Sequence, residues 1–135
     1  CGNSGCVEQY ASATGVVRMA KESMEPDSVL AQKAETLTAK DVFDAAKAGD
    51  TYGCKVVDRF GRYLGIALSN VAQVVDPEAF VIGGGVSAAG QIILDSVEKY
   101  YNEYSMFALK NKEFHLAELG NDAGIYGAVR MVMFQ

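Results

Sequence analysis

The sequence predicts an α/β fold that is mostly helical. Apolar residues recur at spacings of three and four over most of the 135 residues, which is the period of an amphipathic helix. One short apolar run, AFVI at 79–82, ends in three glycines, and a second short run alternates at 114–119. Half of the residues are hydrophobic and 21% are charged, so the chain can bury the core of one domain at most.

The first 37 residues predict one helix and a connection. After a glycine-rich start, apolar side chains follow at helical spacing up to residue 24, with an interruption expected near Gly15. Residues 25–37 contain Pro26 and mixed polarity, which favours an irregular segment with at most a helical turn.

Two helices with recognisable ends should follow. Thr38 can cap a helix while Asp41 reaches back to it, and Gly49 suits the end of that helix. Asp50 can then cap the longest apolar stripe, which extends to Asp76 and Pro77. Gly61 and Gly65, four residues apart, each cost up to about 1 kcal/mol in a helix interior relative to Ala, so we expect another helix to pack closely there.

The remainder predicts a strand, a tight turn and a helix, then a weak strand and a last helix. AFVIGGG at 79–85 is the strand and turn, and a helical pattern follows Ser87 as far as Tyr104. FHLAEL at 114–119 is the weak strand, and GNDAG leads into the last helix, which Asn121 or Asp122 can cap.

Charge and composition exclude several classes of function. Twelve basic against seventeen acidic residues give a net charge of −5, which argues against a nucleic-acid-binding surface. No apolar run approaches the roughly 20 residues that span a bilayer, so we expect no membrane partner. The three cysteines, Cys1, Cys6 and Cys54, are an odd number at uneven spacing, which suits a reducing, cytoplasmic location rather than a disulfide framework.

The triple glycine is the first candidate site. Without side chains, Gly83, Gly84 and Gly85 allow a ligand to approach the backbone, and the helix after Ser87 could offer free amides to an anion. A nucleotide phosphate or an adenine would fit such a turn. The pattern is neither G-x-G-x-x-G nor a Walker loop, since no Lys follows the glycines, and the alternative is a plain tight turn.

Cysteines and acidic residues supply the other candidates. Cys1 and Cys6 have a spacing that zinc sites use, but zinc takes four ligands, and the single histidine, His115, lies in a predicted strand, so a complete site is not expected. Cys54 is expected to be a small buried hydrophobe. Glu8 could accept hydrogen bonds from sugar hydroxyls, or could simply favour the first turn of a helix.

Four segments together resemble the ROK family of sugar kinases and repressors, most closely its bacterial glucokinases: CGNSGCVEQYASATG, YLGIALSN, DPEAFVIGGGVS and LGNDAGIYGA. The family signature reads C-x-C-G-x-x-G-C-x-E, and this sequence has all of it after the first two positions. The resemblance implies an actin-like ATPase with two RNase H-like lobes around a cleft. Residues 1–135 would be a single partial domain, the helix-rich part of the C-terminal lobe.

The resemblance also implies roles for residues. Glu8 would bind glucose or a related hexose. Gly83, Gly84, Gly85 and Ser87 would lie on the adenosine side of ATP, which acts with Mg²⁺. Cys1 and Cys6 would be two of three zinc-binding cysteines.

The catalytic aspartate, the phosphate loop and the zinc-shell histidine of the family have no counterpart in these residues, so we expect no phosphoryl transfer by the chain alone. The uncovered lobe interface would favour a homo-oligomer. The alternative implied is the sugar-sensing effector lobe of a ROK transcriptional repressor.

Overall fold

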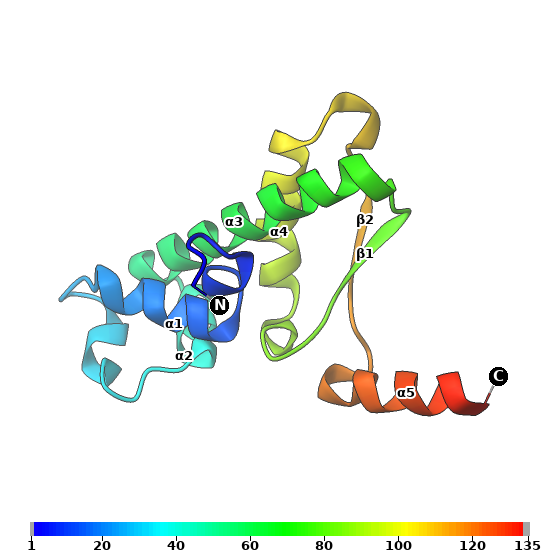
Figure 1. Cartoon of the computed structure of the whole chain (residues 1–135). Coiled ribbons are helices and arrows are strands. Elements are labelled where there is room, and N and C mark those ends of the chain that lie inside the picture. The colour runs from blue at the N-terminus through cyan, green and yellow to red at the C-terminus, as the bar shows by residue number, and fades with distance from the viewer. Residues whose placement is uncertain (1, 134–135) are drawn as a thin grey trace.

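The computed structural model describes residues 2–133 and contains a helical body, a small sheet and a separate last helix (Figure 1). The α-helices and strands follow in the order α1 (Ala13–Glu22), α2 (Ala39–Lys47), α3 (Thr51–Val75), β1 (Ala79–Ile82), α4 (Gln91–Tyr104), β2 (Glu113–Leu116) and α5 (Ala123–Met133). Short 3₁₀ turns lie between them: η1 (Val7–Gln9), η2 (Val29–Lys33), η3 (Ser87–Ala89), η4 (Phe107–Leu109) and η5 (Gly120–Asp122). The α/β, mostly helical fold that the sequence predicts is confirmed.

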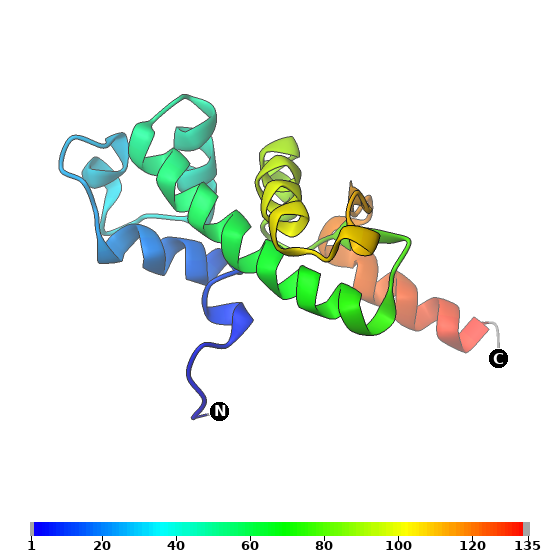
Figure 2. The same cartoon turned by 90° about the horizontal axis from the view of Figure 1, so that it is seen from above.

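Helix α3 is the central helix of the helical body and contacts α1, α2 and α4. Figure 2 shows it running the length of the helical part, with α1 and α2 against one half and α4 across the other. The side chains that these helices bury form one apolar cluster, in which Phe43 of α2 meets Phe60 of α3 edge to face, with ring centroids 5.8 Å apart. Such aromatic pairs add to the stabilisation that burial of apolar area provides.

The two glycines of α3 allow α4 to approach closely, as expected. A Cβ atom on Gly61 would lie 2.6 Å from the carbonyl oxygen of Ser96. A Cβ atom on Gly65 would lie 2.7 Å from both the Cβ of Tyr100 and the amide nitrogen of Tyr101. Since the backbone of α4 occupies the space a side chain would need, only glycine fits at these two positions.

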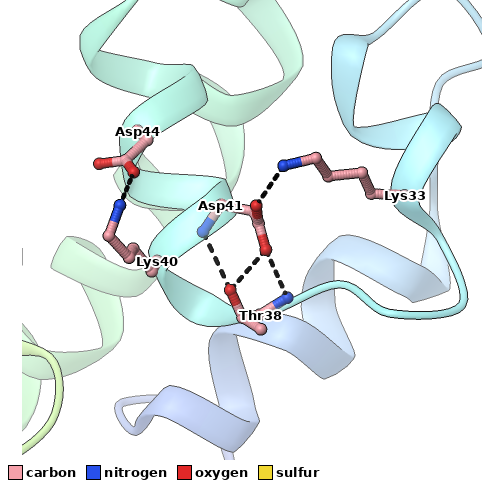
Figure 3. A network of polar contacts seen from close by, with 5 residues as sticks. All are labelled: Lys33, Thr38, Lys40, Asp41 and Asp44. Atoms are coloured by element: carbon pink, nitrogen blue, oxygen red, sulfur yellow. Dashed lines mark hydrogen bonds and ion pairs between the residues drawn. The ribbon is translucent and has the colours of Figure 1, made fainter.

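The predicted capping box at the start of α2 is present (Figure 3). The Thr38 hydroxyl accepts a hydrogen bond from the Asp41 amide at 3.2 Å, and the Asp41 carboxylate accepts one from the Thr38 amide at 3.0 Å. Lys33 of η2 also donates to that carboxylate at 2.7 Å. The Lys33 ammonium and the Thr38 donors lower the pKa of Asp41 well below its ordinary value.

We expect Asp41→Asn to destabilise the fold at neutral pH by about 0.5–2 kcal/mol, the range measured for lost caps. A carboxyl group whose pKa is lower in the folded state stabilises the fold above its unfolded pKa of about 3.9 and loses that contribution as the pH falls below it. The difference between wild type and variant in urea unfolding should therefore shrink between about pH 5 and pH 2. Lys40→Ala, which removes the exposed ion pair with Asp44 on the same helix and leaves the capping box intact, is the control and should change stability by less. A difference independent of pH would contradict the role of the Asp41 charge.

Asp50 caps α3 and also holds η2 in place. Its carboxylate accepts hydrogen bonds from the Gly53 amide at 2.7 Å, the Ser28 hydroxyl at 2.9 Å and the Val29 amide at 3.2 Å. Burial by itself would raise the pKa of Asp50, but these donors outweigh it and lower the pKa. The cap that the sequence predicts therefore also fastens the connection at residues 25–37.

The sheet consists of β1 and β2, which pair in parallel with Phe80 opposite Phe114 and Val81 opposite His115. On the face toward α4, the Phe80 and Phe114 rings stack with centroids 5.1 Å apart, and Tyr101 meets each of them edge-on at 5.3 Å. On the other face Val81 and His115 are exposed. The weak second strand is confirmed, but it spans Glu113–Leu116 and ends before the predicted residue 119. Helix α4 covers only one face of this sheet.

Two expectations about the N-terminal half and Cys54 are wrong. The first helical segment is interrupted at residues 10–12, not near Gly15. Gly15 lies buried inside α1, and a Cβ atom there would come within 2.7 Å of the Gln9 carbonyl oxygen. Cys54 is exposed rather than buried, and its Sγ donates to the Ala46 carbonyl oxygen of α2 at 3.5 Å. Among residues 2–133, no helix combines the length and apolar character that a membrane span requires.

Candidate functional site

The triple glycine forms an exposed turn after β1. Gly84 has φ +78°, a conformation that side chains disfavour, and a Cβ on Gly84 or Gly85 would meet no neighbour within 4 Å. Ser87 closes the turn, because its hydroxyl donates to the Gly84 carbonyl at 2.7 Å and its amide to the same oxygen at 3.1 Å. The turn is thus both shaped by glycine and open to a ligand.

The helix that follows the glycines differs from the expectation. Two of the amides after Ser87 are engaged within η3, where Ala89 donates to Val86 and Gly90 donates to Ser87. Helix α4 begins only at Gln91, after Gly90 has turned the chain at φ +77°. The helix that could present free amides to an anion therefore starts later than the sequence predicts.

A cavity of about 240 Å³ separates the glycine turn from the first turns of α2. Its walls are mostly apolar, and its lining residues are Ala39, Lys40, Phe43, Asp44, Gly85, Val86, Ala88 and Ala89. Ligand sites in proteins occupy about 300–1,000 Å³. This volume suits one flat part of a ligand, such as a purine base, better than a whole nucleotide.

Charge at this cavity comes from one pair on α2. Lys40 donates to the Asp44 carboxylate one helical turn away (Figure 3). The hydrogen bond from Lys40 lowers the pKa of Asp44, and the same bond raises the pKa of Lys40. Both side chains are exposed at the rim, so solvent screens the pair, and each can still hydrogen-bond a ligand.

The α2 residues that line this cavity were not predicted from the sequence. Lys40, Phe43 and Asp44 precede Gly85 by a long stretch of chain, and their local pattern is that of an ordinary capped amphipathic helix. No spacing rule connects them to the glycines. Only the packing of α2 and η3 against each other places the two segments on opposite sides of one cavity.

Glu8 and Cys6 lie in and beside η1, away from that cavity. Glu8 is exposed, and its carboxylate accepts a hydrogen bond from the neighbouring Gln9 side chain at 3.0 Å. Gly5, Val7 and Tyr10 border a second cavity of about 310 Å³, which they share with Tyr63 and neighbouring residues of α3, and Glu8 is not among its lining residues. The exposed Glu8 carboxylate is available to a ligand, and the structure does not bring it to the cavity beside the glycine turn.

The described residues do not form a zinc site. Cys6 is half-buried and free, whereas Cys1 lies outside the described residues. His115 pairs with Glu113 on the exposed face of the sheet, at 3.0 Å. Within residues 2–133 no three side chains of metal-binding type come together, and Cys6 alone cannot satisfy the tetrahedral demand of zinc.

Sequence comparison places the chain among known proteins. The sequence model of the ROK family matches residues 1–134 of this chain. A glucokinase of Halalkalibacterium halodurans is 44% identical to this chain over its whole length, and the match spans 43% of that enzyme. The chain thus spans less than half the length of this curated relative.

Solved structures of ROK family proteins also superpose on this chain. A ROK family glucokinase from Streptomyces griseus, solved in complex with glucose and AMPPNP, superposes with a TM-score of 0.84 at 31% identity, over 97% of this chain and 45% of that one. A ROK family transcriptional regulator, a homologue of the E. coli MLC protein, superposes with a TM-score of 0.71 at 32% identity, over 86% of this chain and 30% of the regulator.

Proposed function

This chain belongs to the ROK family, and from that premise we propose that residues 1–135 are a single partial domain, the C-terminal segment of an ATP-dependent glucokinase. The whole enzyme would transfer the γ-phosphoryl group of ATP to glucose and release glucose 6-phosphate. The observation that carries the proposal is the 44% identity to a glucokinase over the entire chain. A related hexose is the next candidate substrate.

The glycine turn and the cavity beside it support a nucleotide at this end of the molecule. We assign the adenosine side of ATP to Gly83, Gly84, Gly85 and Ser87, with Mg²⁺ accompanying the phosphates. Apolar walls formed by Phe43 and Val86 suit a base that is buried by stacking and by exclusion of water. The fold resembles that of the S. griseus enzyme, which was solved with an ATP analogue.

Glu8 is the proposed contact to the sugar. An ionised carboxylate accepts hydrogen bonds at both oxygens, and bonds from two neighbouring hydroxyls are stronger than neutral ones. Within residues 2–133 the Glu8 carboxylate accepts a hydrogen bond from the exposed Gln9 side-chain amide, which a sugar could displace at little cost. In the full-length protein Cys1 and Cys6 would be two of three zinc-binding cysteines, and of these two the structure describes only Cys6.

Glu8→Gln tests the sugar contact in the intact gene product. Losing hydrogen bonds to a charged group costs about 1.5–3 kcal/mol, so we expect kcat/KM for glucose to fall by roughly 10- to 150-fold. The KM for ATP should not change. Gln9→Ala is the matched control, because it removes the neighbouring side chain and leaves the carboxylate. Unchanged glucose kinetics in the Glu8 variant would remove this residue from the site.

A sugar-sensing repressor is the second candidate, since the MLC homologue shares the fold at 32% identity. Both proteins would bind sugar, but only a kinase would use ATP. The upstream part of the gene separates them: a DNA-reading helix-turn-helix supports the repressor, whereas a catalytic aspartate without one supports the kinase.

A cytoplasmic location and a homo-oligomer complete the proposal. Neither nucleic acid nor a membrane is a proposed partner, given the net charge of −5 and the absence of a basic patch in the sequence. Light scattering on the intact protein measures the oligomeric state directly.

A further inference from the structure

The cavity between the glycine turn and α2 is too small for a whole nucleotide. Its volume of about 240 Å³ lies below the range of about 300–1,000 Å³ that ligand sites occupy. Phe43 and Val86, which are both buried, form its inner walls and suit a base. A glycosidic bond joins the base directly to the ribose. With the base inside this cavity, the ribose must therefore lie at its mouth.

The mouth of the cavity is charged, and the charge comes from α2. Among residues 2–133, only Lys40 and Asp44 line the cavity with polar side chains. These two side chains are 84% and 49% exposed, so they lie where the cavity opens to solvent. They are one helical turn apart and paired with each other (Figure 3). A ribose that leaves the apolar cavity would meet this pair.

Of the two side chains, Asp44 has the chemistry that a ribose requires. The 2′- and 3′-hydroxyls are neighbouring donors, and an ionised carboxylate accepts hydrogen bonds at both of its oxygens, whereas an ammonium group has no acceptor. Lys40 donates to Oδ2 of Asp44, and a ligand hydroxyl can bind at Oδ1 without breaking that bond. The bond also lowers the pKa of Asp44, so the carboxylate is charged at neutral pH. Dinucleotide-binding folds also use an acidic side chain to bind the ribose 2′-hydroxyl.

The opposite wall of the cavity has no side chain that competes for this role. Gly85, Val86, Ala88 and Ala89 line it, and none of them has a polar side chain. The nearby Ser87 hydroxyl donates to the Gly84 carbonyl oxygen at 2.7 Å, inside the turn itself. The glycine turn thus offers backbone and apolar surface to the base, and side-chain recognition of the sugar hydroxyls falls to α2.

We propose that Asp44 binds the ribose hydroxyls of the nucleotide and makes this site select ribonucleotides over 2′-deoxyribonucleotides. Lys40 orients the carboxylate for this contact. The inference rests on the proposed function for the presence of a nucleotide, and it adds a specificity-determining residue to the glycine turn. An exposed ion pair between residues four apart on a helix contributes little to stability, so Asp44 can change without loss of the fold.

Calorimetric titration of the intact gene product with ATP and with 2′-deoxyATP, in the presence of Mg²⁺ and without glucose, tests the proposal. We expect the Kd of the wild type for 2′-deoxyATP to exceed its Kd for ATP by about 5- to 20-fold, because a hydrogen bond to a charged group is lost. Asp44→Ala should weaken ATP binding by at least that factor and bind both nucleotides equally.

Asp95→Ala is the matched control. Asp95 lies on α4, is exposed, and accepts a hydrogen bond at 2.8 Å from Gln91, four residues earlier, but it does not line this cavity. This variant should keep both affinities. Lys40→Ala should keep the preference for ATP, because the Asp44 carboxylate remains.

The outcomes separate the ribose contact from the proposed function. Equal affinities of the wild type for the two nucleotides overturn the contact, as does an Asp44 variant that still prefers ATP. A preference that is lost in the Lys40 variant and kept in the Asp44 variant also overturns it. Absence of ATP binding overturns both the contact and the nucleotide site. An Asp44-dependent preference without phosphorylation of glucose supports the contact and counts against the glucokinase.

Discussion

The 135-residue chain by itself, supplied with glucose and MgATP, is expected to give no turnover above background. Phosphoryl transfer depends on positioning and on charge stabilisation, and the general base that takes the hydroxyl proton contributes about 10²- to 10⁴-fold alone. From the resemblance we expect the family's aspartate for that task to have no counterpart in these residues. Exclusion of water by lobe closure would be lost as well, because the chain offers one side of the proposed cleft.

A coupled assay of glucose 6-phosphate formation measures this expectation. The intact H. halodurans glucokinase is the positive control. We expect activity from the intact enzyme and none from this chain alone. A rate for the single chain that matched the intact enzyme would show that the chemistry lies within these residues.

Gly65→Ala should destabilise the fold by about 1–3 kcal/mol, although alanine is the better helix former. The new Cβ would lie 2.7 Å from the Tyr101 amide nitrogen and 2.9 Å from the Val97 carbonyl oxygen. These are backbone atoms, so no side-chain rotation relieves the contact, and α3 and α4 must move apart. Gly61→Ala should act in the same way through Ser96.

Gly127→Ala in α5 is the control, because it makes the same change in side chain and helix propensity at a position without a close neighbour. No atom lies within 4 Å of its added Cβ, so this change should stabilise helix α5 by up to about 1 kcal/mol without a steric cost. Thermal unfolding followed by circular dichroism measures all three variants. A Gly65 variant as stable as wild type would mean that α3 and α4 do not cross as closely as the structure shows.

The ends of the helices could be predicted because local chemistry decides them. Thr38, Asp41 and Asp50 satisfy amides two to four residues away, so their roles follow from sequence spacing, and Gly49 ends α2 with φ +87°. The glycine turn was predictable for the same reason. The helix after this turn, α4, begins later than the sequence predicts, because apolar periodicity does not indicate the turn at Gly90 or the hydrogen bonds of η3.

The sequence alone thus determined the family, the order of the elements and the caps that bound them, because caps and periodicity act over a few residues. The tertiary structure alone decided that Gly15 is buried, that Cys54 faces solvent, that Phe43 faces Gly85 across a cavity and that α5 lies uncovered. Each of these depends on contacts between segments far apart in the chain, and their energies are set by which surfaces meet.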